Sequence, residues 1–309
     1  MNISLKVEQV YHHIKDKNIL WDINLEIAEG QCVAIVGPSG SGKSTLFRSI
    51  LGTHPPKGGK IYAGDKLITR PTRDVGIVYQ QYTLCPFLTA KRNVAYGLKL
   101  DQTSIPYRIF NFWNWFKLRE KHLEQSQEFL RKMNLTPAAD KYPAELSGGM
   151  KQRVAIAQAL IMKPKVLLLD EPFGALDEAT RENMQTMILT LYDENIKAKE
   201  QGEKPPYTIV LVTHELNEAI LVADRVIGLS QYWKSENDLS GLVCGSTIVY
   251  DKSCPVFEPH SSKDFNSFIE QKEELRRVVF NSDVFQDPRD YVTFWEEVKE
   301  GNGTGVMKF

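Results

Sequence analysis

The spacing of apolar residues changes several times along the chain, and each change predicts a different kind of element. Up to about residue 35, apolar and polar positions alternate in ISLKVEQVYH and ILWDINLEIAEG, which predicts strands with one buried face. The stretches QCVAIVG, KVLLLD and YTIVLV are nearly continuous apolar runs, which are typical of parallel strands buried on both faces. Because helical patterns separate these runs, the sequence predicts an α/β fold.

The middle of the chain is helical and more polar. Its clearest stretch, REKHLEQSQEFLRKMNL, places apolar residues at roughly helical spacing. We therefore expect a helical subdomain at about residues 88–160, inserted into the α/β core of a domain that spans residues 1–235. Residues 236–309 are expected to form a C-terminal extension, with one strand, then mainly helices, and a loose tail, GNGTGVMKF.

Composition narrows the classes of function. The formal net charge is −1 and no run of five or six like charges occurs, so we expect no nucleic acid partner. No apolar stretch approaches the roughly 18 residues of a membrane span, and the N-terminus lacks the apolar core of a signal peptide. A cytoplasmic protein, or a soluble subunit of a membrane-bound assembly, is predicted. Zinc-ligand spacing is absent, so we expect free thiols at Cys32, Cys85, Cys244 and Cys254.

A glycine-rich sequence, GPSGSGKST, fits the P-loop pattern G-x-x-x-x-G-K-[ST] and stands between a buried strand and a helix. Glycines let backbone N–H groups curl around an anion, and the helix N-terminus adds partial positive charge. We expect Lys43 to reach the β- and γ-phosphates of a nucleotide and the Ser44 hydroxyl to bind Mg²⁺. The predicted nucleotide-binding loop comprises Gly37, Pro38, Ser39, Gly40, Ser41, Gly42, Lys43, Ser44 and Thr45.

Two acidic residues follow a buried strand in KVLLLDEP. Asp170 stands at the carboxyl end of that strand, where the ligands of parallel sheets collect, and we expect it to complete the Mg²⁺ shell. Glu171 has left the strand and is expected to orient and polarise a water molecule. Alone, both carboxylates would also fit as simple charges at a strand end, and the P-loop is what favours the catalytic interpretation.

A second phosphate-binding sequence, ELSGGMKQR, begins at Glu145. Ser147 offers a hydroxyl, Gly148 and Gly149 permit close backbone approach, and the helix that follows directs its N-terminus at an anion. The alternative is an ordinary helix N-cap, for which Ser is a favoured residue.

In their order along the chain, these motifs resemble those of the ATP-binding-cassette (ABC) ATPases over about residues 3–230. LSGGMKQR is similar to the family's signature sequence, and residues 37–45 and 166–171 are similar to its Walker A and Walker B motifs. Four further matches are Gln80 to the Q-loop glutamine, Ala175–Leu176–Asp177 to the D-loop, His214 to the switch histidine, and Tyr11 to an aromatic that stacks on adenine.

The resemblance implies a P-loop NTPase core with an N-terminal antiparallel β subdomain, and ATP and Mg²⁺ as ligands. It implies catalytic roles for Lys43, Gln80, Glu171 and His214, and Mg²⁺ contacts from Ser44, Gln80 and Asp170. Two cassettes, either copies or related subunits, would pack head to tail. Ser147, Gly148 and Gly149 of one would then close over the γ-phosphate held by the other, and Tyr11 and Asp177 would complete the nucleotide contacts.

The resemblance also bears on what ATP hydrolysis drives. FLTAKRNVAYGL and DEPFGALDEATR are close to importer sequences, most like those of the nitrate, sulfonate, taurine and bicarbonate group. This implies a peripheral subunit on the inner face of the cell membrane, partnered by transmembrane permease subunits and indirectly by a solute-binding protein. The alternatives are a soluble ABC ATPase that acts on a macromolecular complex and an ABC export ATPase.

One stretch departs from the family pattern. SIPYRIFNFWNWFKLREK, residues 104–121, is longer and more aromatic than the resemblance implies. One interpretation is a lengthened helix that packs its aromatics into the helical subdomain. The other is contact with the membrane subunit or lipid headgroups, because amphipathic aromatics favour wet interfaces.

Overall fold

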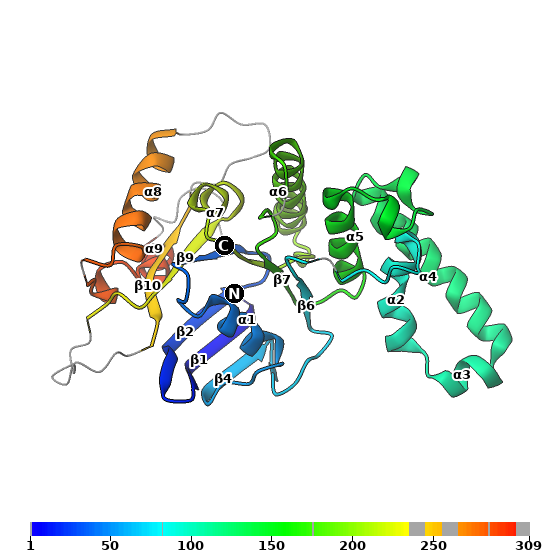
Figure 1. Cartoon of the computed structure of the whole chain (residues 1–309), viewed down its shortest axis with the longest axis horizontal. Coiled ribbons are helices and arrows are strands. Elements are labelled where there is room, and N and C mark those ends of the chain that lie inside the picture. Colours follow the sequence, from blue (N-terminus) through cyan, green and yellow to red (C-terminus); the bar gives the residue numbers. More distant parts are fainter. Residues whose placement is uncertain are drawn as a thin grey trace.

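The computed structural model describes residues 2–81, 83–174, 176–234, 245–254, 265–283 and 285–300. They form two sheets covered by helices, with a helical lobe that projects to one side (Figure 1). Three sequence predictions lie outside the described residues: those for Ala175, Cys244 and the tail at 301–309.

The N-terminal part of the chain forms an antiparallel sheet with the strands β1 (Ile3–Ile14), β2 (Lys17–Ala28), β4 (Gly58–Ala63) and β5 (Lys66–Leu67). Their order is β2-β1-β4-β5, and β1 pairs antiparallel with both of its neighbours. Every second side chain in much of β1 and β2 is buried, which is the alternation that predicted these strands.

The second sheet contains β3 (Cys32–Val36), β6 (Val75–Val78), β7 (Val166–Asp170), β8 (Ile209–Val212), β9 (Arg225–Ser230) and β10 (Thr247–Ser253). The order is β10-β9-β3-β8-β7-β6. All pairs are parallel except β10 with β9, which is antiparallel. The crossovers between parallel strands are helical, so the α/β fold class with a separate antiparallel sheet is confirmed.

The helices divide between the sheets, the projecting lobe and the C-terminal part. Those beside the sheets are α1 (Lys43–Leu51), α6 (Glu178–Glu200) and α7 (Leu216–Val222). The lobe holds α2 (Ala90–Gln102), α3 (Ile105–Phe110), α4 (Phe112–Lys132) and α5 (Gly148–Leu160). The C-terminal part holds α8 (Phe265–Val279) and α9 (Phe294–Glu300). Among the described residues, no helix is both long and apolar enough to cross a membrane.

The six-stranded sheet is buried on both faces, which explains its continuous apolar runs. Val33 and Ile35 of β3 pack into a core with α1 and the antiparallel sheet. Ala34 and Val36 pack into a second core with α6, α7 and helices of the lobe. Close packing of the sheet between these two cores holds the strand ends, and therefore the loops that follow them, in fixed positions.

A buried ion pair fastens the C-terminal part to the sheets. The guanidinium of Arg225 donates to both carboxylate oxygens of Asp251, over 2.7 and 2.6 Å, and also to the carbonyl of Glu26. The ring of Phe294 in α9 lies 3.8 Å from the guanidinium carbon. Because Arg225 has no solvent-exposed surface, these partners are what satisfy its charge and its donors.

Candidate functional site

Four neighbouring strands bring predicted residues to one edge of the six-stranded sheet. The order β3-β8-β7-β6 is parallel throughout, so the carboxyl ends of these strands share an edge. The glycine-rich loop follows β3 and His214 follows β8. Asp170 ends β7 and Gln80 follows β6. Four segments that are distant in sequence therefore meet at this edge.

The loop after β3 takes the shape that its glycines allow. Gly40 and Gly42 both have φ of 83°, in the left-handed region, and Gly42 caps the N-terminus of α1. A side chain on Gly37 would collide with the carbonyl of Leu229, whereas no atom lies within 4 Å of the position that a Cβ on Gly40 would take. Position 37 therefore has no room for a side chain, whereas the outer side of the loop at Gly40 is open.

Lys43 is a buried cation held by that loop. Its ammonium donates to the carbonyls of Gly37 and Pro38 over 2.7 and 3.0 Å. Burial lowers the pKa of Lys43, and the charges of Glu171 and Asp170 partly oppose this. The buried hydroxyl of Ser41 has no hydrogen-bond partner within the described residues. A buried cation and a free hydroxyl beside an open glycine loop are suited to an anionic ligand such as a phosphate chain.

The rest of the loop presents small polar groups. Pro38 is half-buried and Ser39 is exposed. Ser44 is exposed and Thr45 half-buried in the first turn of α1. The loop therefore offers a hydroxyl at the solvent side of the helix N-terminus, where a phosphate-bound cation would lie.

Asp170 is a partly buried carboxylate at the end of β7. Burial raises its pKa, the charge of Glu171 raises it further, and Arg48 and Lys43 oppose the shift. The Ser44 hydroxyl, the Gln80 amide and the Asp170 carboxylate supply the hard oxygen atoms that Mg²⁺ prefers. The donor set at this edge thus fits the predicted metal.

Glu171 stands in the middle of the site. Gln80 donates to its Oε2 over 3.1 Å, and Nδ1 of His214 lies 3.4 Å from its Oε1. The backbone of Glu171 has φ of 46°, which is strained for a residue with a side chain. Its N–H still donates to the carbonyl of Val212, over 2.9 Å, so the turn begins within the ladder of the sheet.

Tyr11 comes from the antiparallel sheet and not from this edge. Its ring meets Trp21 edge-on, with 5.3 Å between the ring centroids, and a Cβ on Gly58 would lie 3.4 Å from it. Burial raises the pKa of Tyr11, with a further contribution from Asp22. The structure therefore gives Tyr11 partners on its own sheet and leaves its contact with adenine a prediction.

The second phosphate-binding sequence lies in the lobe, apart from α1 (Figure 1). Ser147 caps α5 by accepting from the N–H of Met150 over 3.3 Å, and Gly148 is exposed at the first position of the helix. Gly149 is buried, and a Cβ there would collide with the methyl of Thr180. Thr180 in turn donates to Asp177 through its N–H and its hydroxyl, over 3.0 and 2.8 Å.

The N-cap interpretation is therefore correct for Ser147 in the isolated chain. The close approach that Gly149 permits is, in this chain, an approach to Thr180 and hence to the segment that carries Asp177. The start of α5, which the resemblance assigns to the partner's ATP, is thus packed against the start of α6, where Asp177 lies.

Two contacts near the site were not predicted from the sequence. The side-chain amide of Gln152 on α5 donates to the carbonyl of Pro172, directly after Glu171. Arg48 lies one turn after Ser44 on α1 and counteracts the raised pKa of Asp170. The position of Arg48 near the site could have been predicted, because it stands four residues after Ser44 on the same helix. No local sequence pattern predicts the contact between Gln152 and Pro172.

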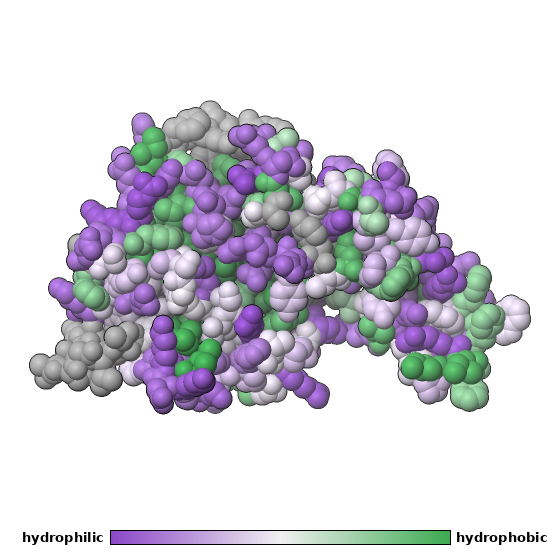
Figure 2. Space-filling view, in the orientation of Figure 1, coloured by the Kyte–Doolittle hydropathy of each residue, from purple (hydrophilic) through white to green (hydrophobic). Residues whose placement is uncertain are grey.

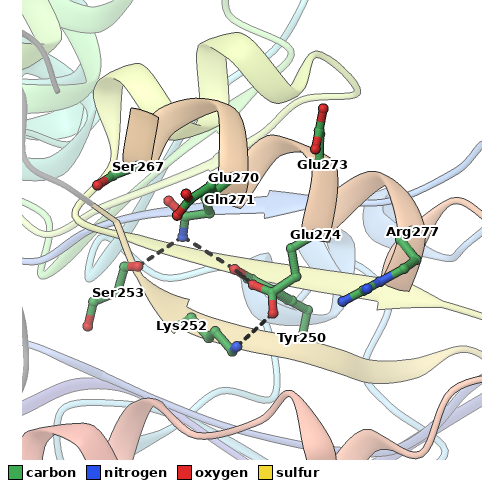
Figure 3. A pocket seen from close by; sticks show the side chains of 9 residues that line it. All are labelled: Tyr250, Lys252, Ser253, Ser267, Glu270, Gln271, Glu273, Glu274 and Arg277. Carbon is green, nitrogen blue, oxygen red and sulfur yellow. Dashed lines mark hydrogen bonds and ion pairs between the residues drawn. The ribbon is translucent and has the colours of Figure 1, made fainter. Parts of the chain in front are cut away.

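A hollow of about 640 Å³ lies elsewhere, between β10 and α8 (Figure 3). Glu274 accepts from the Tyr250 hydroxyl and from Lys252, over 3.0 and 2.9 Å. Gln271 donates to the Tyr250 hydroxyl and to the carbonyl of Ser253. These polar groups mainly satisfy one another, and they are not part of the strand edge described above.

The chain is similar in sequence and in fold to known proteins. The profile described as ABC transporter matches residues 20–174. An ATP-binding protein of Brucella abortus is 42% identical over 205 residues, which are 66% of this chain and 70% of the relative. The sulfate/thiosulfate import ATP-binding protein CysA of Thermosynechococcus vestitus is 33% identical over 301 residues, 94% and 79% of the two chains. The bicarbonate transport ATP-binding protein CmpC of Synechococcus elongatus is 40% identical over 208 residues, 67% and 28%.

Among solved structures, the dimeric post-hydrolysis state of the ATP-binding cassette MJ0796, bound to ADP and Pi, is similar with a TM-score of 0.56 and 32% identity, over 72% of this chain and 93% of that one. The matched sequence includes both the glycine-rich loop and the LSGGMKQR stretch. The chain therefore belongs to the ABC transporter family, as an ATP-hydrolysing ATP-binding cassette.

Proposed function

We propose that this chain is the energising subunit of a membrane importer and hydrolyses ATP between two cassettes packed head to tail. One observation carries the proposal. The strand edge gathers a P-loop, two carboxylates, Gln80 and His214, while Ser147 caps a helix in a separate lobe of the same chain. Each chain thus offers two half-sites that a two-fold pairing would complete.

In this proposal Lys43 binds oxygens of the β- and γ-phosphates. The ammonium is already buried and held by two carbonyls, so its attraction to phosphate is little screened by water. The oxygens of Ser44, Gln80 and Asp170 would hold Mg²⁺, which would supply positive charge to balance that of the phosphates. The backbone N–H groups of residues 37–45 surround the same phosphates.

Glu171 orients and polarises the attacking water, and its geometry supports that role. Gln80 and His214 contact opposite oxygens of the carboxylate and so fix its orientation. His214 also reaches the γ-phosphate and helps hold the water. After hydrolysis the bridge between cassettes is lost and the dimer opens.

The second cassette is a copy of this chain or a related subunit. Ser147, Gly148 and Gly149 supply a hydroxyl and the N-terminus of α5 to the γ-phosphate bound by the other cassette. Asp177 lies at the same interface because Thr180 joins it to Gly149. Tyr11 packs against adenine. The dimeric MJ0796 structure supports this pairing.

The transported solute is a small molecule of the nitrate, sulfonate, taurine or bicarbonate type. The similarity to import proteins for sulfate/thiosulfate and for bicarbonate supports this class. Transmembrane permease subunits, and through them a solute-binding protein, are the partners, and the chain lies on the inner face of the cell membrane. An export ATPase, or an ABC ATPase acting on a macromolecular complex, is the alternative.

A mixing experiment tests the composite site. The Lys43→Ala and Ser147→Asp variants are each expected to lack cooperative hydrolysis, because each damages both sites of its own dimer. A mixed dimer keeps one intact site, so an equimolar mixture should recover about a quarter of the wild-type sites. No recovery, or full hydrolysis by either variant alone, would contradict the head-to-tail arrangement.

A second experiment tests import. A tagged chain should co-purify with a transmembrane protein, and cells that carry the chain should take up labelled nitrate, taurine, sulfonate or bicarbonate. Glu171→Gln should abolish that uptake while leaving co-purification intact. Association with ribosomes or chromosomal complexes in place of a membrane protein would support the alternative.

A further inference from the structure

The turn between α3 and α4 presents large apolar side chains to solvent. Between 45% and 88% of the surface of each is exposed. Figure 2 shows apolar residues gathered over α3, at the outer end of the lobe. We call this set the apolar tip, and it comprises Ile105, Ile109, Phe110, Phe112, Trp113 and Phe116.

The tip projects because few side chains of the helical hairpin formed by α3 and the start of α4 pack against the rest of the lobe. α3 buries no side chain, and the buried side chains of α4, His122, Ser126 and Leu130, all lie in its later part. Packing of the aromatics into the subdomain, one of the two expectations from the sequence, is therefore wrong for the tip. Among the aromatics of residues 110–116 it applies only to Trp115, which is half-buried and meets His122 edge-on at 6.5 Å.

The hairpin is nevertheless braced. Arg108 donates to the hydroxyl and to the carbonyl of Thr103, over 3.0 Å each, and its guanidinium carbon lies 5.8 Å from the centre of the Trp115 ring. Because these contacts join the end of α2, α3 and α4, the tip is exposed on a structured support.

Cations follow the tip along α4. Lys117, Arg119 and Lys121 are exposed and form no ion pair within the described residues, and Glu120 is the only carboxylate in residues 104–121. Trp113, Lys117 and Lys121 are spaced at i, i+4 and therefore share one stripe of the helix. The two lysines stand roughly 6 and 12 Å up the helix axis from Trp113. Since the whole chain has a net charge of −1, this basic band is local.

We propose that the apolar tip inserts into the interface of an anionic lipid bilayer, with the basic band at the level of the lipid phosphates. With α4 along the membrane normal, the roughly 6 Å rise from Trp113 to Lys117 places the aromatic tip in the interfacial region when the lysine lies at the lipid phosphates. Trp favours this depth, and each Lys or Arg near an anionic surface adds about 1 kcal/mol.

The charge pattern favours lipid over a protein partner. The buried centres of protein interfaces are depleted of lysine, whereas anionic membranes attract it. This contact goes beyond the proposed function, because it would attach the chain to lipid directly and needs neither a permease nor ATP.

Sedimentation of the purified full chain with lipid vesicles tests the proposal. The vesicles are phosphatidylcholine alone, or equal parts of phosphatidylcholine and phosphatidylglycerol. The wild-type chain should bind the anionic vesicles, and binding should weaken with added salt. The double variants Phe110→Ser/Trp113→Ser and Lys117→Gln/Lys121→Gln should each lower the partition coefficient by at least about tenfold.

Matched controls are Phe285→Ser, which removes an exposed aromatic elsewhere, and Lys57→Gln/Lys60→Gln, which removes two exposed lysines elsewhere. Both should bind vesicles like the wild type, and all variants should bind ATP. Three results would overturn the proposal: no binding of the wild type to anionic vesicles, unchanged binding of the tip variants, or tip-dependent capture of a permease or a second copy without any lipid binding.

Discussion

The side-chain amide of Gln80 donates a hydrogen bond to Oε2 of Glu171 over 3.1 Å, although 91 residues separate the two in sequence. Gln80 stands where β6 leaves the core towards the lobe, and Glu171 stands at the end of β7. A movement of the lobe would therefore reach the carboxylate through this bond. The same turn is touched from the lobe by Gln152, which donates to the carbonyl of Pro172. One amide from the strand edge, that of Gln80, and one from the lobe, that of Gln152, thus hold the segment that carries Glu171.

Glu171→Gln should abolish most ATP turnover. The amide keeps the shape of the side chain but is a far weaker base, so we expect about a 10²- to 10⁴-fold loss of turnover with ATP affinity within a few fold of wild type. Phosphate release and equilibrium ATP binding measure the two effects. Glu203→Gln, an exposed carboxylate on a surface loop, is the control and should retain full activity. Near-normal hydrolysis by Glu171→Gln would contradict the role assigned to this carboxylate.

The sequence predicted the contiguous parts of this site because their geometry is local. A buried strand, glycines and a helix start specify the loop at residues 37–45 within one stretch of chain. The left-handed backbone of Glu171 was not predictable, because non-glycine residues rarely adopt it and only the surrounding sheet holds it there. Likewise, the full burial of Arg225 depends on partners that lie in β2, β10 and α9.

Two glycines of the loop should respond differently to alanine. Gly37→Ala places a methyl against the carbonyl of Leu229, so the free energy of unfolding should fall by about 1–3 kcal/mol. Gly40→Ala meets no atom within 4 Å and costs only the strain of its left-handed backbone, about 1–2 kcal/mol, but its methyl would face the incoming phosphates.

Urea unfolding and ATP titration separate these two effects. Gly202→Ala is a matched control for Gly40→Ala, because Gly202 also has a positive φ and no atom within 4 Å of a Cβ. Gly202→Ala should show similar strain and normal ATP affinity, whereas Gly40→Ala should bind ATP at least about tenfold more weakly. Equal ATP affinities for these two variants would contradict a phosphate site at the loop.

Ser147 can be altered without loss of its cap. Ser147→Asp keeps an oxygen that accepts from the N–H of Met150, so stability should change by less than about 0.5 kcal/mol, whereas Ser147→Ala should lose about 1 kcal/mol. The added carboxylate of Ser147→Asp would repel the partner's γ-phosphate, so cooperative hydrolysis should vanish while one chain still binds ATP. Wild-type hydrolysis by Ser147→Asp would show that this residue is an N-cap and nothing more.

Gly149 requires a paired change because it packs on Thr180 in its own chain. Gly149→Ala should destabilise the fold by about 1–3 kcal/mol through the collision with the Thr180 methyl. Thr180→Ser removes that methyl and keeps the hydroxyl that donates to Asp177, so the double variant should recover most of the stability. We expect hydrolysis to stay low in the double variant. Recovery of hydrolysis together with stability would limit Gly149 to a packing role.

Asp224 should make stability fall as pH rises. The residue is buried before β9, and burial raises its pKa from 3.8 to about 6, against the opposing effect of the Tyr192 hydroxyl. Because the folded-state pKa lies above the unfolded value, the folded chain binds more protons between about pH 4 and 6, and the free energy of unfolding declines through this window. Above it, the ionised carboxylate costs about 3 kcal/mol.

Asp224→Asn removes this titration. Relative to wild type, the variant should gain stability in urea unfolding at about pH 8 and gain little or none at about pH 4, because the wild-type carboxyl is already protonated there. Asp65→Asn, at an exposed position, controls for the loss of a negative charge and should show no such dependence on pH. A difference between wild type and Asp224→Asn that stays constant from pH 4 to pH 8 would mean that Asp224 does not titrate within the core.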